Sequence, residues 1–273
     1  MAVPASGLPA DGHVFDHSLR LAEAGHGRFR GELDRRWWVI SGPNGGFLSS
    51  LCLHALRQVV GTDRHPRTLS LHFPARATEG PVEVEVRIEK EGRTFTFASG
   101  RMWQEDKLLI AFLGAFADAR EATAFDDVSV PEVRPPEELE APAIPDEMIP
   151  DFSRNFDYRP VSEMNLFSGA DRAEATGWIR FAAERPVDDL MIATTMDAFY
   201  PAIFTKLTSL ADVATIDLTI HFRATLPLPY DWLLGRFTTR RLTEGFCEED
   251  GEVWSRDKTL LAQSRQLAVV RPL

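Results

Sequence analysis

The sequence predicts an α+β protein made of two similar units fused head to tail, in which each unit wraps an antiparallel sheet around one central helix. Three observations lead to this prediction. A group of residues near position 105 recurs near position 256, each half opens on a helical pattern of apolar residues, and several strand-like segments follow each helix.

The repeat consists of three short motifs in the same order in both halves. A strand-like segment ends in His-Phe at His72 and at His221, a Glu-Gly turn follows, and Trp-x-x-Asp-Lys then begins at Trp103 and at Trp254. The copies are 149 positions apart at the histidines and 151 at the tryptophans. Coincidence of common turn residues is the alternative, but it would rarely reproduce both order and distance.

Each half opens on a predicted helix. Gly45–Val60 carries apolar residues at a helical period. In the second half, Asp188 and Asp189 are candidate caps before an apolar run that continues towards Phe204, with Pro201 expected to kink or end it. Because this run is apolar almost all round, we expect the second helix to be buried.

Strands are predicted after each helix. Residues 82–88 alternate apolar with charged side chains, which is typical of a sheet with one solvated face. Phe95, Phe97 and residues 108–116 continue the pattern, with a tight turn near 105–107. The corresponding strands of the second half are predicted at 215–223, 232–240, 246–254 and 259–270.

These patterns divide the chain into three parts. Residues 1–118 form the first unit and residues 152–273 the second. Residues 119–151 are rich in Pro, Glu and Ala, and such a composition buries little apolar surface. We therefore expect an extended linker that can wrap across the protein.

Charge and composition exclude several classes of function. A net charge of -11 and a pI near 5.2 give no general attraction to a phosphate backbone, so no nucleic-acid partner is predicted. Cys52 and Cys247 lie in no metal-ligand or disulfide spacing, which predicts no metal site and a reducing cytoplasm. Residues 1–12 lack the pattern of a signal peptide and read as a frayed terminus, and no apolar stretch could span a bilayer. Without P-loop or Rossmann glycines, no cofactor is expected.

Three short motifs in the second half carry a family resemblance. They are Met-Asp-Ala-Phe around Asp197, Ala-Thr-Ile-Asp around Thr215 and Ser-Arg-Gln-Leu around Gln266. With the repeated helix and strands, they make the chain resemble the double hotdog fold and, more specifically, the type II acyl-CoA thioesterases. The resemblance covers nearly the whole chain outside the linker, and it implies that these Asp, Thr and Gln side chains hold the hydrolytic water. The linker and the start of the first strand depart from the family, so no particular substrate is carried over.

The chemistry of these three residues also bears on a site independently of the resemblance. Asp197 lies on the apolar stripe of its helix, where a carboxylate must be paired, hydrogen-bonded or neutralised. An Asp on a wet helix edge is an equal alternative on pattern alone. Thr215 and Gln266 offer neutral hydrogen-bonding groups, although Thr in a strand and Gln on a last strand are often structural or exposed.

An oxyanion site is predicted where the first helix begins. The segment Gly-Pro-Asn-Gly-Gly offers backbone N–H groups at a helix start, and we assign Gly45 or Gly46 as the oxyanion donor, with Asn44 nearby. A turn with Asn44 as N-cap and no ligand is the alternative.

Serine and metal chemistry are not supported by the remaining residues. No Gly-x-Ser-x-Gly is present. His13 and His17 are four apart, but their surroundings are strand-like, so they should not share a helix face as metal ligands. His72 and His221 end equivalent strands, and a structural role is expected first, with a lining position near the acyl site as the alternative.

The sequence thus predicts an acyl-CoA thioesterase, with one site per chain and an apolar acyl pocket between helix and sheet. Arg67, Arg76 and Arg223 are the candidates for the phosphates of coenzyme A. A non-catalytic acyl-CoA binding protein and a hotdog hydratase or dehydratase are the alternatives, although the second helix lacks the catalytic His expected of the latter. A homodimer is expected by analogy with other hotdog proteins.

Overall fold

The computed structural model describes residues 12–40, 42–161 and 164–273, so the predicted frayed terminus lies almost wholly outside the described residues. The helices are α1 (Val14–Ser18), η1 (Arg35–Trp37), α2 (Gly45–Val60), η2 (Pro136–Glu138), η3 (Asp146–Met148), η4 (Phe152–Asn155), α3 (Asp189–Thr195) and α4 (Ile203–Lys206). The strands are β1 (Ala22–Gly25), β2 (Arg28–Leu33), β3 (His65–His72), β4 (Gly80–Glu91), β5 (Thr96–Gln104), β6 (Lys107–Ala117), β7 (Phe156–Pro160), β8 (Ala173–Phe181), β9 (Ala211–Phe222), β10 (Leu233–Thr239), β11 (Leu242–Thr243), β12 (Phe246–Trp254) and β13 (Leu260–Pro272).

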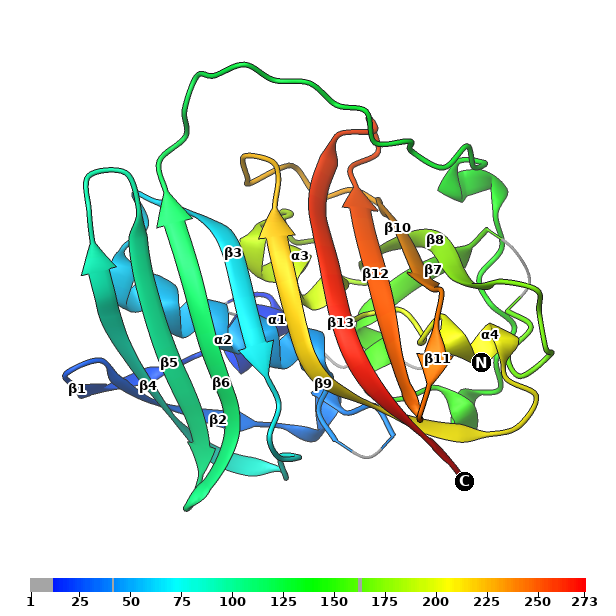
Figure 1. The fold of residues 1–273 in the computed structure, drawn as a ribbon, viewed down its shortest axis with the longest axis horizontal. Helices are drawn as coiled ribbons and strands as arrows, with labels where there is room; N and C mark the ends of the chain where they lie inside the picture. The colour runs from blue at the N-terminus through cyan, green and yellow to red at the C-terminus, as the bar shows by residue number, and fades with distance from the viewer. Residues whose placement is uncertain (1–11, 41, 162–163) are drawn as a thin grey trace.

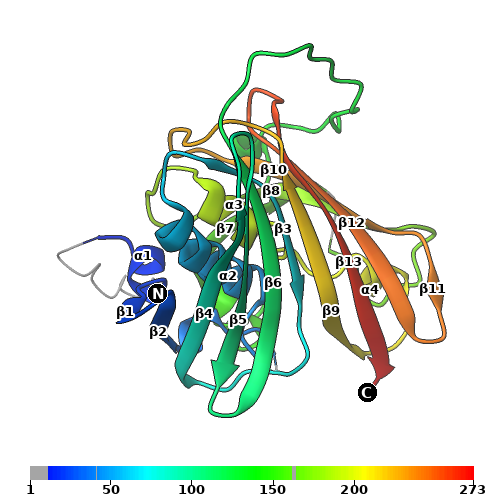
Figure 2. The same cartoon turned by 60° about the vertical axis from the view of Figure 1, so that its left-hand side comes forward.

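The strands form one curved antiparallel sheet with α2 and α3 against one of its faces (Figures 1 and 2). The strand order is β1-β2-β4-β5-β6-β3-β9-β13-β12-β10-β8-β7, and β11 pairs with β12 off this path. Helix α2 packs against β4, β5 and β6 and also against α3. The predicted α+β class, with helices enclosed by a large antiparallel sheet, is confirmed.

The two halves of the sheet meet at β3 and β9, and their register follows the sequence repeat. Ser70 pairs with Thr219, which lies 149 positions later, and the two hydroxyls are hydrogen-bonded at 3.1 Å. On either side the strand order runs symmetrically outwards, through β6, β5, β4 and β2 in one half and β13, β12, β10 and β8 in the other. The equivalent positions of the repeat therefore occupy equivalent positions in the sheet.

Helix α2 has the predicted bounds because both of its ends are marked in the sequence. Asn44 is the N-cap, and its side-chain oxygen accepts a hydrogen bond from the N–H of Phe47 at 3.0 Å. Gly61 follows the last turn with a φ of 92°, a conformation that favours glycine.

Helix α3 is shorter than the sequence predicted. Asp188 caps it as expected, and the run 189–195 is buried, but regular helix ends at Thr195 instead of continuing towards Phe204. Two tighter bonds, from the N–H groups of Asp197 and Ala198 to carbonyls three residues earlier, close its last turn. The chain then passes Pro201, which cannot donate to a continuing helix, before α4 begins.

The strand-like reading around His13 and His17 is wrong. His13 is the N-cap of α1, with its Nδ1 accepting from the N–H of Phe15 at 3.1 Å, and His17 lies inside this short helix. No metal-binding cluster of His, Cys, Asp or Glu occurs within the described ranges.

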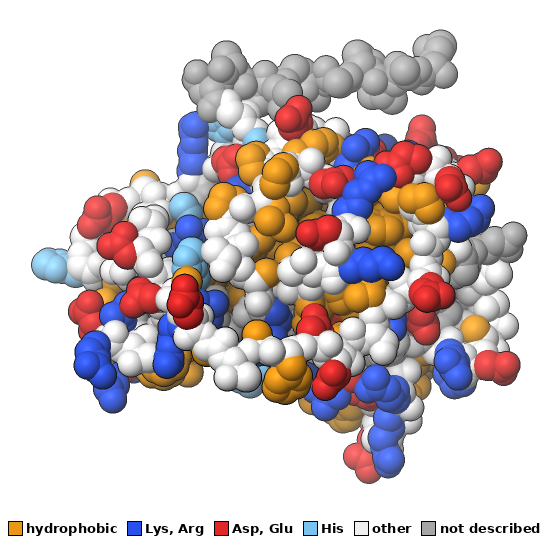
Figure 3. Space-filling model, turned by 90° about the horizontal axis from the view of Figure 1, so that it is seen from above, with side chains coloured by type: hydrophobic (Ala, Val, Ile, Leu, Met, Phe, Trp, Pro, Cys, Tyr) orange, Lys and Arg blue, Asp and Glu red, His pale blue; other side chains and the backbone are white. Residues whose placement is uncertain are grey.

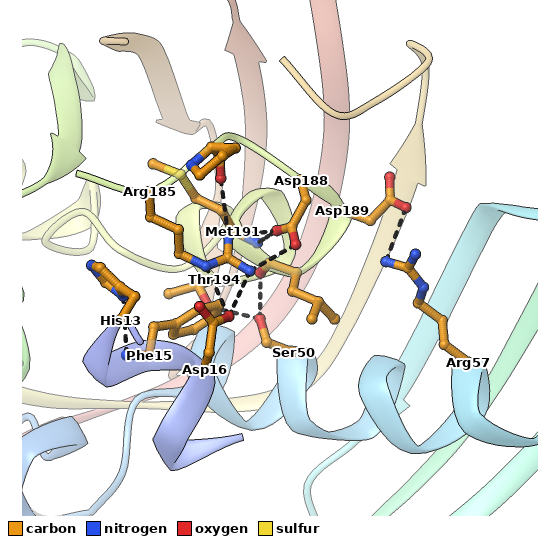
Figure 4. A network of polar contacts seen from close by, with 12 residues as sticks. His13, Phe15, Asp16, Ser50, Arg57, Arg185, Asp188, Asp189, Met191 and Thr194 are labelled. Carbon is orange, nitrogen blue, oxygen red and sulfur yellow. Dashed lines mark hydrogen bonds and ion pairs between the residues drawn. The ribbon is translucent and has the colours of Figure 1, made fainter. Parts of the chain in front are cut away.

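A polar network holds α1, α2 and α3 together (Figure 4). The buried Arg185 forms ion pairs with Asp188 at 2.7 Å and with Asp16 of α1 at 2.9 Å. Between α2 and α3, the hydroxyls of Ser50 and Thr194 lie 2.6 Å apart, both fully buried. Satisfied buried polar pairs of this kind fix one arrangement of the two helices.

The segment 119–151 crosses from β6 to the far half of the sheet (Figure 1). Most of its residues are exposed, in keeping with an extended linker, but a few of its apolar side chains pack against the sheet. Leu139 is 8 % exposed and belongs to an apolar cluster on the outer sheet face, together with Trp178, Trp232, Leu234, Trp254 and Leu260. The indole N–H of Trp178 also donates to the carbonyl of Arg134 at 2.9 Å. The segment therefore covers a sheet face that would otherwise expose tryptophans.

Figure 3 shows acidic and basic side chains interspersed around apolar ones on the face seen from above. Within the part of the chain that the structure describes, no helix is long and apolar enough to pass through a membrane.

Candidate active site

A pocket of about 690 Å³ lies where the start of α2 meets the segment after α3 and the strands β9, β12 and β13. Its lining includes five predicted site residues: Asn44, Gly45, Asp197, Thr215 and Gln266. Much of the remaining lining is apolar and includes Leu48, Phe73, Phe199, Phe204, Val213 and Phe246. An apolar pocket with a few convergent polar groups is the usual form of a small-molecule site.

The carboxylate of Asp197 lies at the N-terminus of α2. Its Oδ2 accepts hydrogen bonds from the N–H of Gly46 and from the side-chain nitrogen of Asn44, each at 3.2 Å. Asn44 also donates to the backbone carbonyl of Asp197 at 2.6 Å. Since the first N–H groups of a helix lack partners within the helix and carry partial positive charge, they stabilise an anion placed there.

Both glycines are required by this close approach. A Cβ on Gly45 would lie 2.8 Å from Oδ2 of Asp197, and a Cβ on Gly46 would lie 2.3 Å from the carbonyl oxygen of Thr194. Any larger residue at either position would push the helix N-terminus away from the carboxylate or from α3.

Burial raises the pKa of Asp197 to about 6. The hydrogen bonds from the N–H groups of Gly46 and Gly45 and from the side chain of Gln266 act in the opposite direction and only partly offset the desolvation. The carboxylate is therefore mainly ionised at neutral pH but is a stronger base than an ordinary Asp, which suits proton abstraction from water.

Thr215 reaches the pocket because β9 contains a bulge. Asp217 pairs with Leu267, but Thr215 pairs with the next residue, Ala268, so Ile216 is an extra residue in the strand. The carbonyl of Ile216 accepts instead from the N–H of Phe73 at 2.9 Å. Without the bulge, the period of two that buries Leu218 would turn Thr215 to the outer face.

Thr215 and Gln266 are in direct contact. The hydroxyl of Thr215 donates to the amide oxygen of Gln266 at 2.9 Å, and Gln266 is 7 % exposed. The side chain of Gln266 is also close enough to Asp197 to lower the pKa of that carboxyl group. The three residues named by the family resemblance thus surround one corner of the pocket.

Glu249 is a pocket residue that the sequence reasoning missed. It is 7 % exposed, and its Oε1 accepts from the amide nitrogen of Gln266 at 2.8 Å. Burial raises the pKa of Glu249 to about 7, with the nearby carboxylate of Asp197 adding to the increase. A signal was available, because Cys247, Gly251 and Val253 alternate with outward acids and so place Glu249 on the inner face.

The remaining predicted residues, three arginines and two histidines, differ in whether they line the pocket. Arg76 lines the pocket and forms an ion pair with Asp212 at 2.6 Å, whereas Arg67 and Arg223 are not among the lining residues. Arg67 donates to the carbonyl of Asp118. His72 and His221 are exposed at their strand ends and do not line the pocket either.

The curved antiparallel sheet around buried helices, with a polar pocket at a helix start, defines a hotdog-fold protein with the site of an enzyme. Family models match both halves: the acyl-CoA thioesterase N-terminal domain over residues 34–118 and the acyl-CoA thioesterase C-terminal domain over residues 131–270. The chain belongs to the acyl-CoA thioesterase family and is a thioester hydrolase. The second match begins inside the predicted linker, in keeping with its packing on the sheet.

Solved structures share the fold over nearly the whole chain. A conserved protein of unknown function with a hotdog fold from Alicyclobacillus acidocaldarius has a TM-score of 0.89 at 24 % identity, over 96 % of this chain and 99 % of that one. A putative thioesterase II from Thermobifida fusca YX has a TM-score of 0.80 at 25 % identity, over 94 % and 97 %. An uncharacterized protein of Mycobacterium tuberculosis is 25 % identical over 268 residues, which cover 89 % of this chain and 90 % of that protein.

Proposed function

We propose that the pocket hydrolyses an acyl-CoA thioester with a water held between Asp197, Thr215 and Gln266. The observation that carries the proposal is the position of the Asp197 carboxylate on the pocket wall, held by a helix N-terminus and with a pKa near 6. A base of this strength next to two neutral hydrogen-bonding side chains is equipped to activate water.

The hydrogen-bond directions support a defined water position. Because the hydroxyl of Thr215 donates to Gln266, its oxygen is left to accept a hydrogen bond from the water. The second N–H of the Gln266 amide faces Asp197, and it would donate to the water oxygen when a water lies between these two side chains. Asp197 would accept the other proton of the water.

In the proposed reaction Asp197 takes a proton from the water as the oxygen attacks the thioester carbonyl. The tetrahedral intermediate then re-forms its carbonyl and breaks the carbon–sulfur bond. The proton held by Asp197 passes to the leaving thiolate, which gives the free acid, coenzyme A and a regenerated carboxylate. No group outside this chain is needed except water.

We also propose a role in binding the oxyanion and the substrate for the start of α2, at Asn44, Gly45 and Gly46. In this structure the N–H of Gly46 and the side-chain nitrogen of Asn44 are engaged by Asp197. We assign them first to holding the base. When Asp197 becomes protonated it attracts these N–H groups less, and the developing oxyanion is the stronger acceptor in reach.

The chain is further proposed to be a double hotdog with one site, with units at 1–118 and 152–273 joined by 119–151. The symmetric strand order and the bulges at Arg67 and Ile216, 149 positions apart, support two units. At the repeat spacing, Pro66 takes the place of Thr215 and Ala115 that of Gln266. The first unit therefore lacks the groups to hold a water. A cytoplasmic location and a homodimer stay predictions.

Free-thiol release from acyl-CoA esters of increasing chain length tests the function. We expect the wild-type protein to release thiol and the Asp197→Ala variant to lose release while keeping its fold. Acyl-CoA binding without thiol release by the wild type would favour a binding protein, and addition of water to an enoyl-CoA would favour a hydratase. Unchanged turnover by Asp197→Ala would remove the assignment of the base.

A further inference from the structure

Glu249 is a buried acid at the pocket whose role the proposed reaction leaves open. It lies on β12 directly opposite Gln266 on β13, and both side chains face the inside of the sheet. Both of its oxygens are engaged, since Oε1 accepts from Gln266 at 2.8 Å and Oε2 from the backbone N–H of Ala202 at 2.6 Å. Keeping a carboxylate buried costs free energy, and an apolar residue would pack here without that cost.

We propose that Glu249 is a positioning residue for hydrolysis: its carboxylate fixes the amide of Gln266, so that the amide oxygen meets Thr215 and an N–H faces Asp197. This inference rests on the proposed function and deepens it. Glu249 acts through Gln266 and does not touch the substrate.

The argument follows from which groups donate and accept. An ionised carboxylate only accepts hydrogen bonds, so the atom of Gln266 that faces Glu249 has to be the nitrogen. The amide oxygen then lies on the other side, where it accepts from the hydroxyl of Thr215. Thr215 therefore donates to Gln266, and Gln266 donates to Glu249. Because the hydroxyl proton of Thr215 is used in this way, its oxygen is free to accept a hydrogen bond from water.

A neutral residue at position 249 removes this constraint. A glutamine there presents either an oxygen or a nitrogen, so the amide of Gln266 can turn over. In the Glu249→Gln variant, the amide oxygen of Gln266 could face the introduced glutamine and its nitrogen could face Thr215. The direction of both hydrogen bonds would then be reversed. The N–H that faces Asp197 would be lost in that orientation.

The same two strands contain a matched control. Glu252 and Gln263 are also directly opposite on β12 and β13, and their side chains approach to 3.5 Å. They lie on the outer face, where Glu252 is ion-paired with Arg236. Glu252→Gln therefore makes the same chemical change at a Glu–Gln pair away from the pocket.

The test is a double-mutant cycle on the full chain, assayed by thiol release from decanoyl-CoA and palmitoyl-CoA at pH 8. Glu249→Gln is expected to lower kcat by about 10- to 100-fold with KM within about twofold of wild type, as expected when a catalytic group is misplaced. In a Gln266→Ala background the same change should have no further effect on kcat. Glu252→Gln should behave as wild type, and the thermal midpoint of Glu249→Gln should not fall.

Two results would overturn the inference: wild-type kcat in Glu249→Gln, or an equal loss of kcat with and without Gln266. If Glu249→Gln does not fold, Glu249→Asp takes its place. Glu249→Asp keeps a carboxylate acceptor but shortens the side chain, so the inference requires its kcat to fall below that of wild type. In a Gln266→Ala background, Glu249→Asp must cause no further loss of kcat. A wild-type protein that releases no thiol overturns the proposed function as well, whereas an active wild type with fully active position-249 variants overturns this inference alone.

Discussion

The N–H of Gly46 donates to the carboxylate of Asp197, which lies 151 positions later in the chain, at 3.2 Å. The helix start comes from one half of the sequence and the acid from the other. Neither half alone contains the pocket, because its other polar groups lie on β9, β12 and β13. The candidate site therefore depends on how α2 and α3 pack together.

Gly45→Ala tests this contact. A Cβ at position 45 would lie 2.8 Å from Oδ2 of Asp197, so the carboxylate has to move. We expect kcat to fall by about 10- to 100-fold, since displacement of a catalytic group by about 1 Å has this effect. The thermal midpoint should change little, because alanine favours a helix start more than glycine does. Gly42→Ala, whose Cβ meets nothing within 4 Å, is the control; equal activity of the two variants would contradict the prediction.

The pH dependence of hydrolysis should report the buried acids. Asp197 must be ionised to act as base, and its pKa is raised to about 6. Glu249, with its pKa raised to about 7, must be ionised to hold Gln266. We expect kcat/KM to be highest above pH 7 and to fall as the pH drops through this range. Because the two acids interact, the pH at which kcat/KM falls reflects the coupled titration of both residues and not of either one alone. A profile that is flat down to pH 5 would exclude a base of this kind.

Asp197→Asn should stabilise the protein at neutral pH while abolishing activity. The pKa of Asp197 is higher in the folded than in the unfolded chain, so the folded state binds more protons between about pH 4 and pH 6. Its contribution to stability is present below about pH 4 and is lost as the pH rises through 6. The variant should thus gain about 1–3 kcal/mol over wild type at pH 8 and nothing at pH 4. Urea unfolding at the two pH values measures the difference; a gain at pH 4 of the same size would point to another cause.

The kcat should depend on the hydroxyl of Thr215 and not on its methyl group. Thr215→Val keeps the shape but leaves the amide oxygen of Gln266 and the water without their partner. We expect kcat to fall by about 10-fold or more, which corresponds to one hydrogen bond of about 1–2 kcal/mol. Thr215→Ser should retain most of the activity. Similar kcat values for the Val and Ser variants would show that the hydroxyl has no part in the reaction.

Local sequence signals predicted the elements better than the contacts between them. The bounds of α2 and β12 could be predicted because each has a clear period, and α2 has a cap at both ends. The end of α3 was misplaced because an apolar run looks helical whether or not the backbone continues. The bulge at Ile216 leaves no mark, since Ala-Thr-Ile-Asp is an ordinary strand sequence, yet it brings Thr215 to the pocket.

The site residues were named from short motifs, and their contacts could not be derived from spacing. Nothing in the sequence distance between Gly46 and Asp197 indicates that a helix start will meet a carboxylate. Glu249 was overlooked because β12 is rich in acids, and only its position on the inner face separates it from its exposed neighbours. For residues 119–151 the composition indicated a mostly exposed segment, but it did not indicate that a few apolar side chains would cover the tryptophans.

Leu139→Ala tests whether residues 119–151 belong to the folded structure. Leu139 is 8 % exposed and packs with Trp178 and Trp254 on the outer face of the sheet, far along the chain from the pocket residues. Removing its side chain should lower the free energy of unfolding by about 2–3 kcal/mol, as is usual for truncation of a buried leucine. The kcat of the folded protein should not change, because none of the described residues of this cluster lines the pocket. Glu140→Ala, at an exposed neighbouring position, is the control. Equal unfolding free energies for the two variants would mean that the segment is a passive connection, and the buried surface it shares with the sheet would then contribute nothing to stability.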